Sequence, residues 1–183
     1  MIPVRTLGHS NHPVERFVDL LRAAGIEVVI DVRSTPWSRR FPQFGRERLA
    51  TSLAAAGIAY RHEGAALGGK PGDGADYEAL AARPAFVAAL DRLSAEAETR
   101  ALCLVCAEKE PLDCHRTVLV ARRLAERGIA VEHLLADGGR RDHAALEEML
   151  LGPPDDLFAA SRPRAERLAE AWRSRERTMK RGR

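Results

Sequence analysis

The stretch Cys103-Leu104-Val105-Cys106-Ala107-Glu108-Lys109-Glu110-Pro111-Leu112-Asp113-Cys114-His115-Arg116 says most about how this chain folds. An apolar run ends in a thiol and a carboxylate. A short loop with a proline follows, and then a second thiol, an imidazole and a guanidinium begin the next segment. This order predicts a buried strand, a loop and the start of a helix. In α/β proteins such a corner is a place where ligands bind.

The same alternation of strand and helix extends along the whole chain. Glu27-Val28-Val29-Ile30-Asp31-Val32 has three consecutive β-branched apolar residues, which is typical of a strand buried on both faces of a parallel sheet. We expect an α/β fold: a single three-layer domain over residues 1–151, with a mostly parallel sheet of about five strands and helices on both faces. The other predicted strands are 4–7, 58–62, 101–106 and 129–135. The predicted helices are about 13–24, 46–56, 76–97 with a break near Pro84, 114–127 and 142–151.

Composition limits the class of protein. The chain has 183 residues, of which 45% are hydrophobic and 30% charged, as in a globular protein with one main core. It has no apolar run near the roughly 18 residues of a membrane span, so we expect no membrane partner. Three cysteines do not indicate a disulfide framework, and we expect a cytoplasmic location.

Charge is distributed unevenly. Ser161–Arg183 contains 9 Lys and Arg against 3 Asp and Glu, a net charge of +6, and the rest of the chain contains 20 against 23, a net of −3. We therefore treat residues 152–183 as a basic C-terminal helical extension. A solvated, frayed helix is the simpler interpretation, and contact with nucleic acid is the alternative.

Polar side chains stand where each predicted strand ends. The carboxyl ends of parallel strands lie at one edge of a sheet, so we expect these side chains to share one crevice. They are His9 after the first strand, Asp31 and Arg33 after the second, His62 and Glu63 after the third, Cys106 and Glu108 after the fourth, and Asp137 after the fifth.

The cysteines divide into core and crevice. Nearby cations and a helix N-terminus would favour a thiolate at Cys106, so Cys106 or Glu108 is predicted to act as nucleophile or base. Cys114 either pairs with Cys106 or supports the corner by packing. Residues three apart on a strand point to opposite faces, so Cys103 belongs to the core and does not indicate a zinc site with Cys106. Metal binding by Cys106, Cys114 and His115 stays an alternative, and no residue is assigned to a metal.

Cations near the strand ends favour an anionic ligand. Arg33 and Arg116 are predicted to bind it, the latter together with helix amides. The loop from Arg33 to Phe41 mixes arginines with aromatic side chains, as surfaces that stack bases do. The glycine-rich segment 64–74 brings Lys70 but lacks the spacing of a phosphate-binding P-loop. His9 and His115 are predicted to move protons. The remaining predicted ligand-contacting or supporting residues are Ser10, Asn11, Asp31, Trp37 and His62.

Four motifs resemble those of the family known as domain of unknown function 488: Thr6-Leu7-Gly8-His9-Ser10-Asn11, Asp31-Val32-Arg33-Ser34-Thr35-Pro36-Trp37-Ser38, Leu67-Gly68-Gly69, and the segment from Cys106 to Arg116. The resemblance covers roughly residues 4–140 and leaves out the tail. It implies a compact α/β domain with an active site built from these motifs, and it brings no established reaction. The residue set that it implies is His9, Asp31, Arg33, Cys106, Glu108, Cys114, His115 and Arg116.

These observations favour an enzyme acting on an anionic, phosphate-bearing substrate such as a nucleotide or nucleic acid. One alternative is a non-catalytic module that binds a nucleotide or nucleic acid. Another is thiol redox chemistry or metal binding that uses Cys106, Cys114 and His115. The pattern indicates neither a cofactor nor an oligomeric state.

Overall fold

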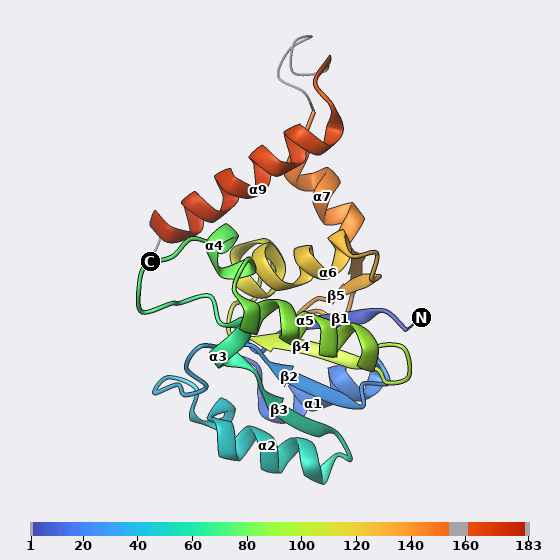
Figure 1. Ribbon diagram of the computed structural model, residues 1–183. Helices are drawn as coiled ribbons and strands as arrows, with labels where there is room; N and C mark the ends of the chain where they lie inside the picture. The colour runs from blue at the N-terminus through green and yellow to red at the C-terminus, as the bar shows by residue number, and fades with distance from the viewer. Residues whose placement is uncertain (1, 154–160, 182–183) are drawn as a thin grey trace.

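A computed structural model describes residues 2–153 and 161–181 (Figure 1). Its centre is a six-stranded sheet with the order β3-β2-β4-β1-β5-β6. All neighbouring strands are parallel except β5 and β6, which are antiparallel. The expected mostly parallel α/β sheet is therefore confirmed. The strands are β1 (Val4–Gly8), β2 (Val28–Asp31), β3 (Ala59–His62), β4 (Leu102–Cys106), β5 (Val131–Leu134) and β6 (Arg140–Asp142).

Helices cover both faces of the sheet, as expected for three layers. The chain moves in one direction across the sheet from β1 to β3 and returns to β4 and β5, so right-handed crossovers place the two sets of helices on opposite faces. One face carries α1 (Val14–Ala23) and α2 (Arg46–Ala55). The other carries α3 (Gly64–Leu67), α4 (Tyr77–Ala81), α5 (Pro84–Glu96), α6 (Arg122–Glu126) and α9 (Arg164–Arg181), while α7 (His143–Leu151) follows β6 (Figure 1).

The core consists of two apolar clusters, one on each side of the sheet. Along β4, Cys103 and Val105 belong to the cluster beneath α1 and α2, whereas Leu104 and Cys106 belong to the cluster beneath α5 and α6. This alternation follows from the pleat of a strand. It confirms that Cys103 is a core residue that points away from Cys106.

Two elements differ from the sequence-based expectation. The sheet has a sixth strand, β6, whose three residues are all charged and show no apolar alternation. The predicted helix over 114–127 is instead a π-helical segment, η3 (Arg116–Ala121), that continues into α6, and all six residues of η3 are buried. The wider turn of a π-helix is frequent at functional sites.

The C-terminal helix α9 packs on the domain, so the expectation of a solvated, frayed helix is wrong for this segment. Trp172 is 2% exposed and belongs to the main core cluster, where it stacks on His143 with ring centroids 5.7 Å apart. Arg175 donates from Nε to the carbonyl of Leu112 at 2.8 Å and forms an ion pair with Asp113. Part of the proposed boundary region, residues 154–160, lies outside the described residues, and the division at residue 151 stays a prediction.

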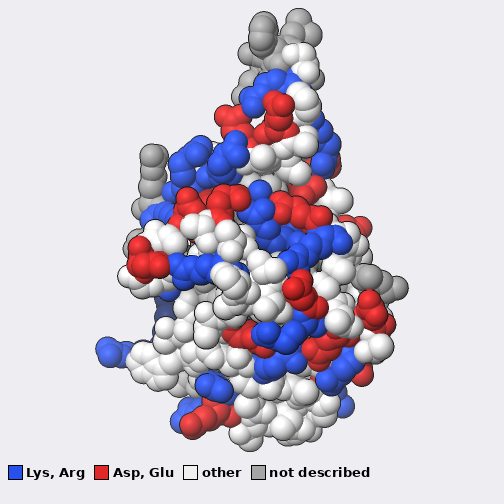
Figure 2. All heavy atoms as spheres, in the orientation of Figure 1, with Lys and Arg blue, Asp and Glu red and all other residues white. Residues whose placement is uncertain are grey.

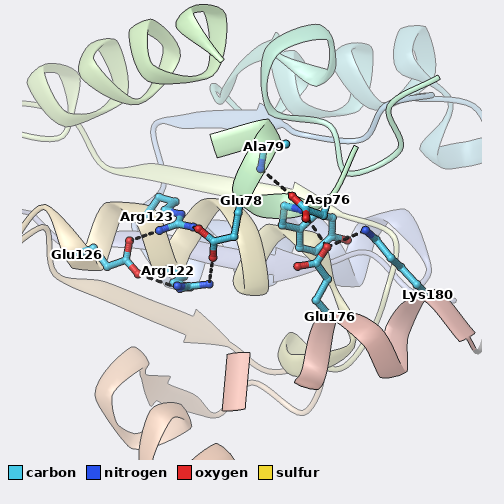
Figure 3. Close-up of polar contacts among 9 residues, drawn as sticks. Asp76, Glu78, Ala79, Arg122, Arg123, Glu126, Glu176 and Lys180 are labelled. Carbon is cyan, nitrogen blue, oxygen red and sulfur yellow. Dashed lines mark hydrogen bonds and ion pairs between the residues drawn. The ribbon is translucent and has the colours of Figure 1, made fainter. Parts of the chain in front are cut away.

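Polar contacts connect α4 to α6 and to α9 (Figure 3). Glu78 forms ion pairs with Arg122 and Arg123. Glu176 of α9 accepts a hydrogen bond from the backbone N–H of Tyr77 at 2.9 Å and pairs with Lys180 at 2.7 Å. The tail is therefore joined to the domain by apolar and polar contacts. Within the described residues, no helix combines the length and the apolar character needed to cross a lipid bilayer.

Candidate active site

A cleft of about 810 Å³ opens at the carboxyl edge of the sheet. It lies where the neighbouring strands β1 and β4 end, and their following connections run to opposite faces of the sheet, which is the usual ligand site in such folds. We call His9, Arg33, Cys106, Glu108 and His115 the cleft floor, and Ser10, Asn11, Trp37, Arg40, Lys70 and Lys109 the cleft rim.

Three floor residues, Cys106, Glu108 and His115, form a cluster with Cys114, which is fully buried and outside the cleft lining. The sulfur atoms of Cys106 and Cys114 lie 3.0 and 2.9 Å from the same oxygen, Oε2 of Glu108. Cys106 Sγ lies 3.5 Å from Nδ1 of His115. His115 donates from Nε2 to the carbonyl of Val32 at 2.8 Å, which turns its Nδ1 toward the thiols. The loop of the motif 103–116 therefore brings Cys106 and Glu108 together with Cys114 and His115.

Arg116 holds the loop of this motif from beneath. Its side chain is fully buried and donates to the carbonyls of Glu108 at 2.5 Å and Lys109 at 3.1 Å. Gly8 makes the same approach possible from β1, because a Cβ at that position would lie 1.8 Å from the Glu108 carbonyl oxygen. Arg116 was expected to contact a ligand, but it is outside the cleft lining and its side chain supports the loop.

The side chain of Arg33 lies at the floor of the cleft, but most of its hydrogen bonds are made to Asp31. Its Nε and Nη2 donate to the two oxygens of Asp31 at 2.8 and 2.6 Å. Asp31 is fully buried and also accepts from the hydroxyl of Tyr60 at 2.8 Å. His62 donates to the Arg33 carbonyl at 2.8 Å. Burial acts to lower the pKa of Arg33, but the bond to Asp31 and its charge raise it overall, so the guanidinium stays charged. Asp31 and His62 therefore position Arg33 from outside the cleft lining.

His9 is a neutral imidazole with both nitrogens engaged. Its Nδ1 donates to the Ser10 carbonyl at 3.0 Å, and its Nε2 accepts from Arg33 Nη1 at 3.2 Å. The ring stacks on Phe44 with centroids 4.2 Å apart. Burial, and then the charge of Arg33, lower the pKa of His9 to about 4. It can take up a proton only by giving up its contact with Arg33.

The electrostatics of the two thiols differ. Burial, followed by Cys114 and Glu108, raises the pKa of Cys106 well above its ordinary value, so the expected thiolate at Cys106 is not what this environment favours. Burial would also raise the pKa of Cys114, but the hydrogen bond from Cys106 and the charge of Arg116 lower it overall. His115 likewise has its pKa lowered by burial but raised overall by Cys114.

Several residues depart from the expected common crevice. Glu63 and Asp137 lie outside the cleft lining; Asp137 instead accepts a hydrogen bond from the Gly139 backbone at 2.8 Å. Sequence reasoning did not single out Tyr60 or Lys109. Lys109 directly follows Glu108 in the motif, which was a usable signal, whereas Tyr60 sits within a strand and carried none.

The Leu67-Gly68-Gly69 motif explains how the glycine-rich segment reaches the site. A Cβ at Gly69 would lie 2.5 Å from Cβ and Cγ of His115, so the backbone passes directly over that side chain. The neighbouring Lys70 backbone N–H donates to Ser34 Oγ at 3.1 Å, which places Lys70 at the rim.

Fold and site together define a three-layer α/β protein with a Cys–Glu–His cluster at the floor of a polar cleft. A match to the family described as "Domain of unknown function DUF488" covers residues 13–123, well over half of the chain, so the chain belongs to this family. No curated protein and no solved structure matches it.

Proposed function

We propose that this protein is an enzyme acting on a small phosphate-bearing ligand, with a nucleotide as the favoured class. The observation that carries the proposal is the charge of the cleft. Arg40, Lys70 and Lys109 stand at its rim and Arg33 at its floor, while Glu108 is the single carboxylate among the residues that line it. A concave, positively charged surface concentrates anions.

A nucleotide fits the rim better than a simple anion does. Trp37 is 65% exposed on the same loop as Arg40, although an aromatic ring of this size is usually covered. An indole beside a guanidinium offers a base a stacking surface while the cations hold its phosphate. Ser34 and Ser38 also line the cleft.

The cluster at the floor supports a catalytic role over simple binding. A ligand held at the rim would present one end to Cys106, Glu108 and His115, which all line the cleft. Thiol, carboxylate and imidazole groups are the ones that enzymes use as nucleophiles, bases and metal ligands. All three cysteines are free thiols, and we propose the reducing cytoplasm as the setting in which this cluster works.

Nucleic-acid binding by the basic tail stays the alternative. In the described part of the tail, Arg162, Arg164, Arg175 and Lys180 form ion pairs with carboxylates. Figure 2 shows basic and acidic side chains interspersed on this face. Paired charges attract a polyanion less than an uninterrupted basic patch does, so the cleft is favoured over the tail.

Calorimetric titration of the full-length protein with inorganic phosphate, AMP and ATP tests the proposal. We expect Lys70→Ala and Lys109→Ala each to weaken nucleotide binding about fivefold, or about 1 kcal/mol, as loss of a partly exposed charge pair does. Trp37→Ala should weaken the binding of AMP and ATP and leave the binding of inorganic phosphate unchanged. Arg48→Ala, an exposed arginine of α2 outside the cleft, is the matched control. Equal binding by the rim variants and the wild type would refute the assignment.

A further inference from the structure

We propose that Cys106, Glu108, Cys114 and His115 form a binding site for one divalent metal ion of the zinc class at the floor of the cleft. One ligand atom from each of the four residues, two sulfurs, one imidazole nitrogen and one carboxylate oxygen, lies within 4.8 Å of all the others. Thiolate and imidazole ligands select zinc among the divalent ions common in proteins.

The spacing of the ligand atoms agrees with tetrahedral coordination. Bond lengths of about 2.3 Å to sulfur and about 2.0–2.1 Å to nitrogen or oxygen place neighbouring ligand atoms about 3.5 Å apart at a tetrahedral angle. Cys106 Sγ and His115 Nδ1 are 3.5 Å apart. The two contacts of sulfur with Glu108 Oε2, at 3.0 and 2.9 Å, need to lengthen by only about half an ångström. The other pairs of ligand atoms lie within 4.8 Å of each other, so an ion can be reached by small movements of the side chains.

The groups around the cluster orient the ligands as in known metal sites. A histidine that binds a metal usually donates its other ring N–H to a carbonyl or carboxylate. His115 does so to the Val32 carbonyl at 2.8 Å, which leaves Nδ1 facing the thiols. The backbone N–H of Arg116 points at Cys114 Sγ at 3.4 Å. These contacts fix two of the four ligands before any ion arrives.

Charge and exposure indicate what kind of metal site this is. A divalent ion with two thiolates and one carboxylate has a net charge of −1, and the buried guanidinium of Arg116, which acts electrostatically on both thiols, offsets it. Cys106, Cys114 and His115 are at most 4% exposed, whereas Glu108 is partly exposed and lines the cleft. A catalytic zinc site has three protein ligands and a fourth position for water or substrate, and Glu108 occupies the one position here that faces the cleft.

The catalytic meaning of the ion rests on the proposed function, while the site itself rests on these four side chains. An ion here would lie at the floor beneath the rim cations. There it would polarise a phosphate oxygen of a ligand held by Lys70 and Lys109.

Cobalt substitution tests the site with the metal alone. The reduced full-length protein, stripped by a chelator, is titrated with Co²⁺. We expect one equivalent to produce a thiolate-to-cobalt charge-transfer band and intense visible bands of tetrahedral cobalt, and Zn²⁺ to bleach both. Cys114→Ser should weaken Co²⁺ binding by at least the roughly 10–100-fold that loss of a supporting partner causes. Cys103→Ala is the control. Cys103 is a buried thiol on the same strand as Cys106, but it faces the other core cluster.

Glu108→Gln is a second test that does not depend on the folding of Cys114→Ser. The Glu108 side chain is partly exposed, and glutamine has the same shape. This variant should fold, keep the charge-transfer band and lower the affinity for Co²⁺. The absence of a charge-transfer band in the wild type, or an undiminished band in Cys114→Ser, overturns the inference. Nucleotide binding is measured separately on the metal-free protein. Metal uptake without nucleotide binding therefore refutes the proposed function alone, and nucleotide binding without metal uptake refutes the metal site alone.

Discussion

Lowering the pH from 7 to 5 is expected to reduce the free energy of unfolding by about 2 kcal/mol through a single side chain, His143. This residue is 4% exposed and lies beneath Trp172 of α9. Its Nδ1 shares a hydrogen bond of 3.0 Å with Nε2 of His133. Burial is the main reason that the pKa of His143 falls from 6.5 to about 4; the charge of Arg122 acts in the same direction and that of Glu126 against it.

The sign follows from which state binds the proton first. In the unfolded chain His143 becomes protonated as the pH falls through about 6.5, whereas in the folded protein it stays neutral until about 4. The stabilisation is therefore complete above pH 6.5 and is lost progressively toward pH 4. At pH 5 most of the difference between the two pKa values is expressed, which gives the figure of about 2 kcal/mol.

Urea unfolding followed by the fluorescence of Trp172, in a Trp37→Phe background that leaves one tryptophan, measures the effect. His143→Asn is the comparison, since its side-chain amide can replace Nδ1 as the hydrogen-bond partner of His133 and does not titrate. The difference in unfolding free energy between pH 7 and pH 5 should be about 2 kcal/mol smaller in the variant, because asparagine does not titrate. Carboxylates and other histidines contribute to the pH dependence of both proteins, so the comparison isolates His143. An equal pH dependence in the two proteins would show that His143 does not carry the effect.

Three further substitutions test how the site and the tail are held. Gly8→Ala should destabilise the protein by at least about 1–3 kcal/mol in chemical unfolding, because its Cβ would overlap the Glu108 carbonyl, and an unchanged midpoint would contradict that close approach. Asp31→Asn should cost about 3–5 kcal/mol by leaving the buried Arg33 guanidinium without its counter-charge, and a smaller loss in thermal melting would argue that water reaches the pair. Trp172→Ala should cost about 3–5 kcal/mol, whereas a loss below about 1 kcal/mol would mean that α9 does not share the core.

The sequence was sufficient for the sheet because its strands are apolar and β-branched. Val28, Val29 and Ile30 are buried on both faces, as their composition predicted. The strand β6 could not be predicted, since three charged residues carry no period and become a strand only by pairing with β5. The π-helical start of the last crossover was hidden for a similar reason, because no local pattern distinguishes it from an α-helix.

Part of the site could be predicted because ligands bind at the carboxyl ends of parallel strands. His9, Arg33 and Cys106 do meet in one cleft. Strand order could not be derived from the sequence, and it puts β3, which leads to Glu63, at an edge of the sheet, two strands away from β4. Asp137 lies in the turn between β5 and β6, where it accepts from the Gly139 backbone. The sequence also could not predict that the Arg116 side chain points into the protein. Its partners are backbone carbonyls, which every sequence has, so only the tertiary structure determines the contact.

The position of β1 affects where this polypeptide can be cut. The family match starts at residue 13, yet β1 spans Val4–Gly8 and pairs with β4 on one side and β5 on the other. A recombinant fragment trimmed to residues 13–123 would lose β1, β5 and β6 and turn β4 into an open, apolar edge, which invites aggregation. The shortest fragment worth expressing therefore starts before Val4 and extends through α9, whose Trp172 belongs to the main core cluster.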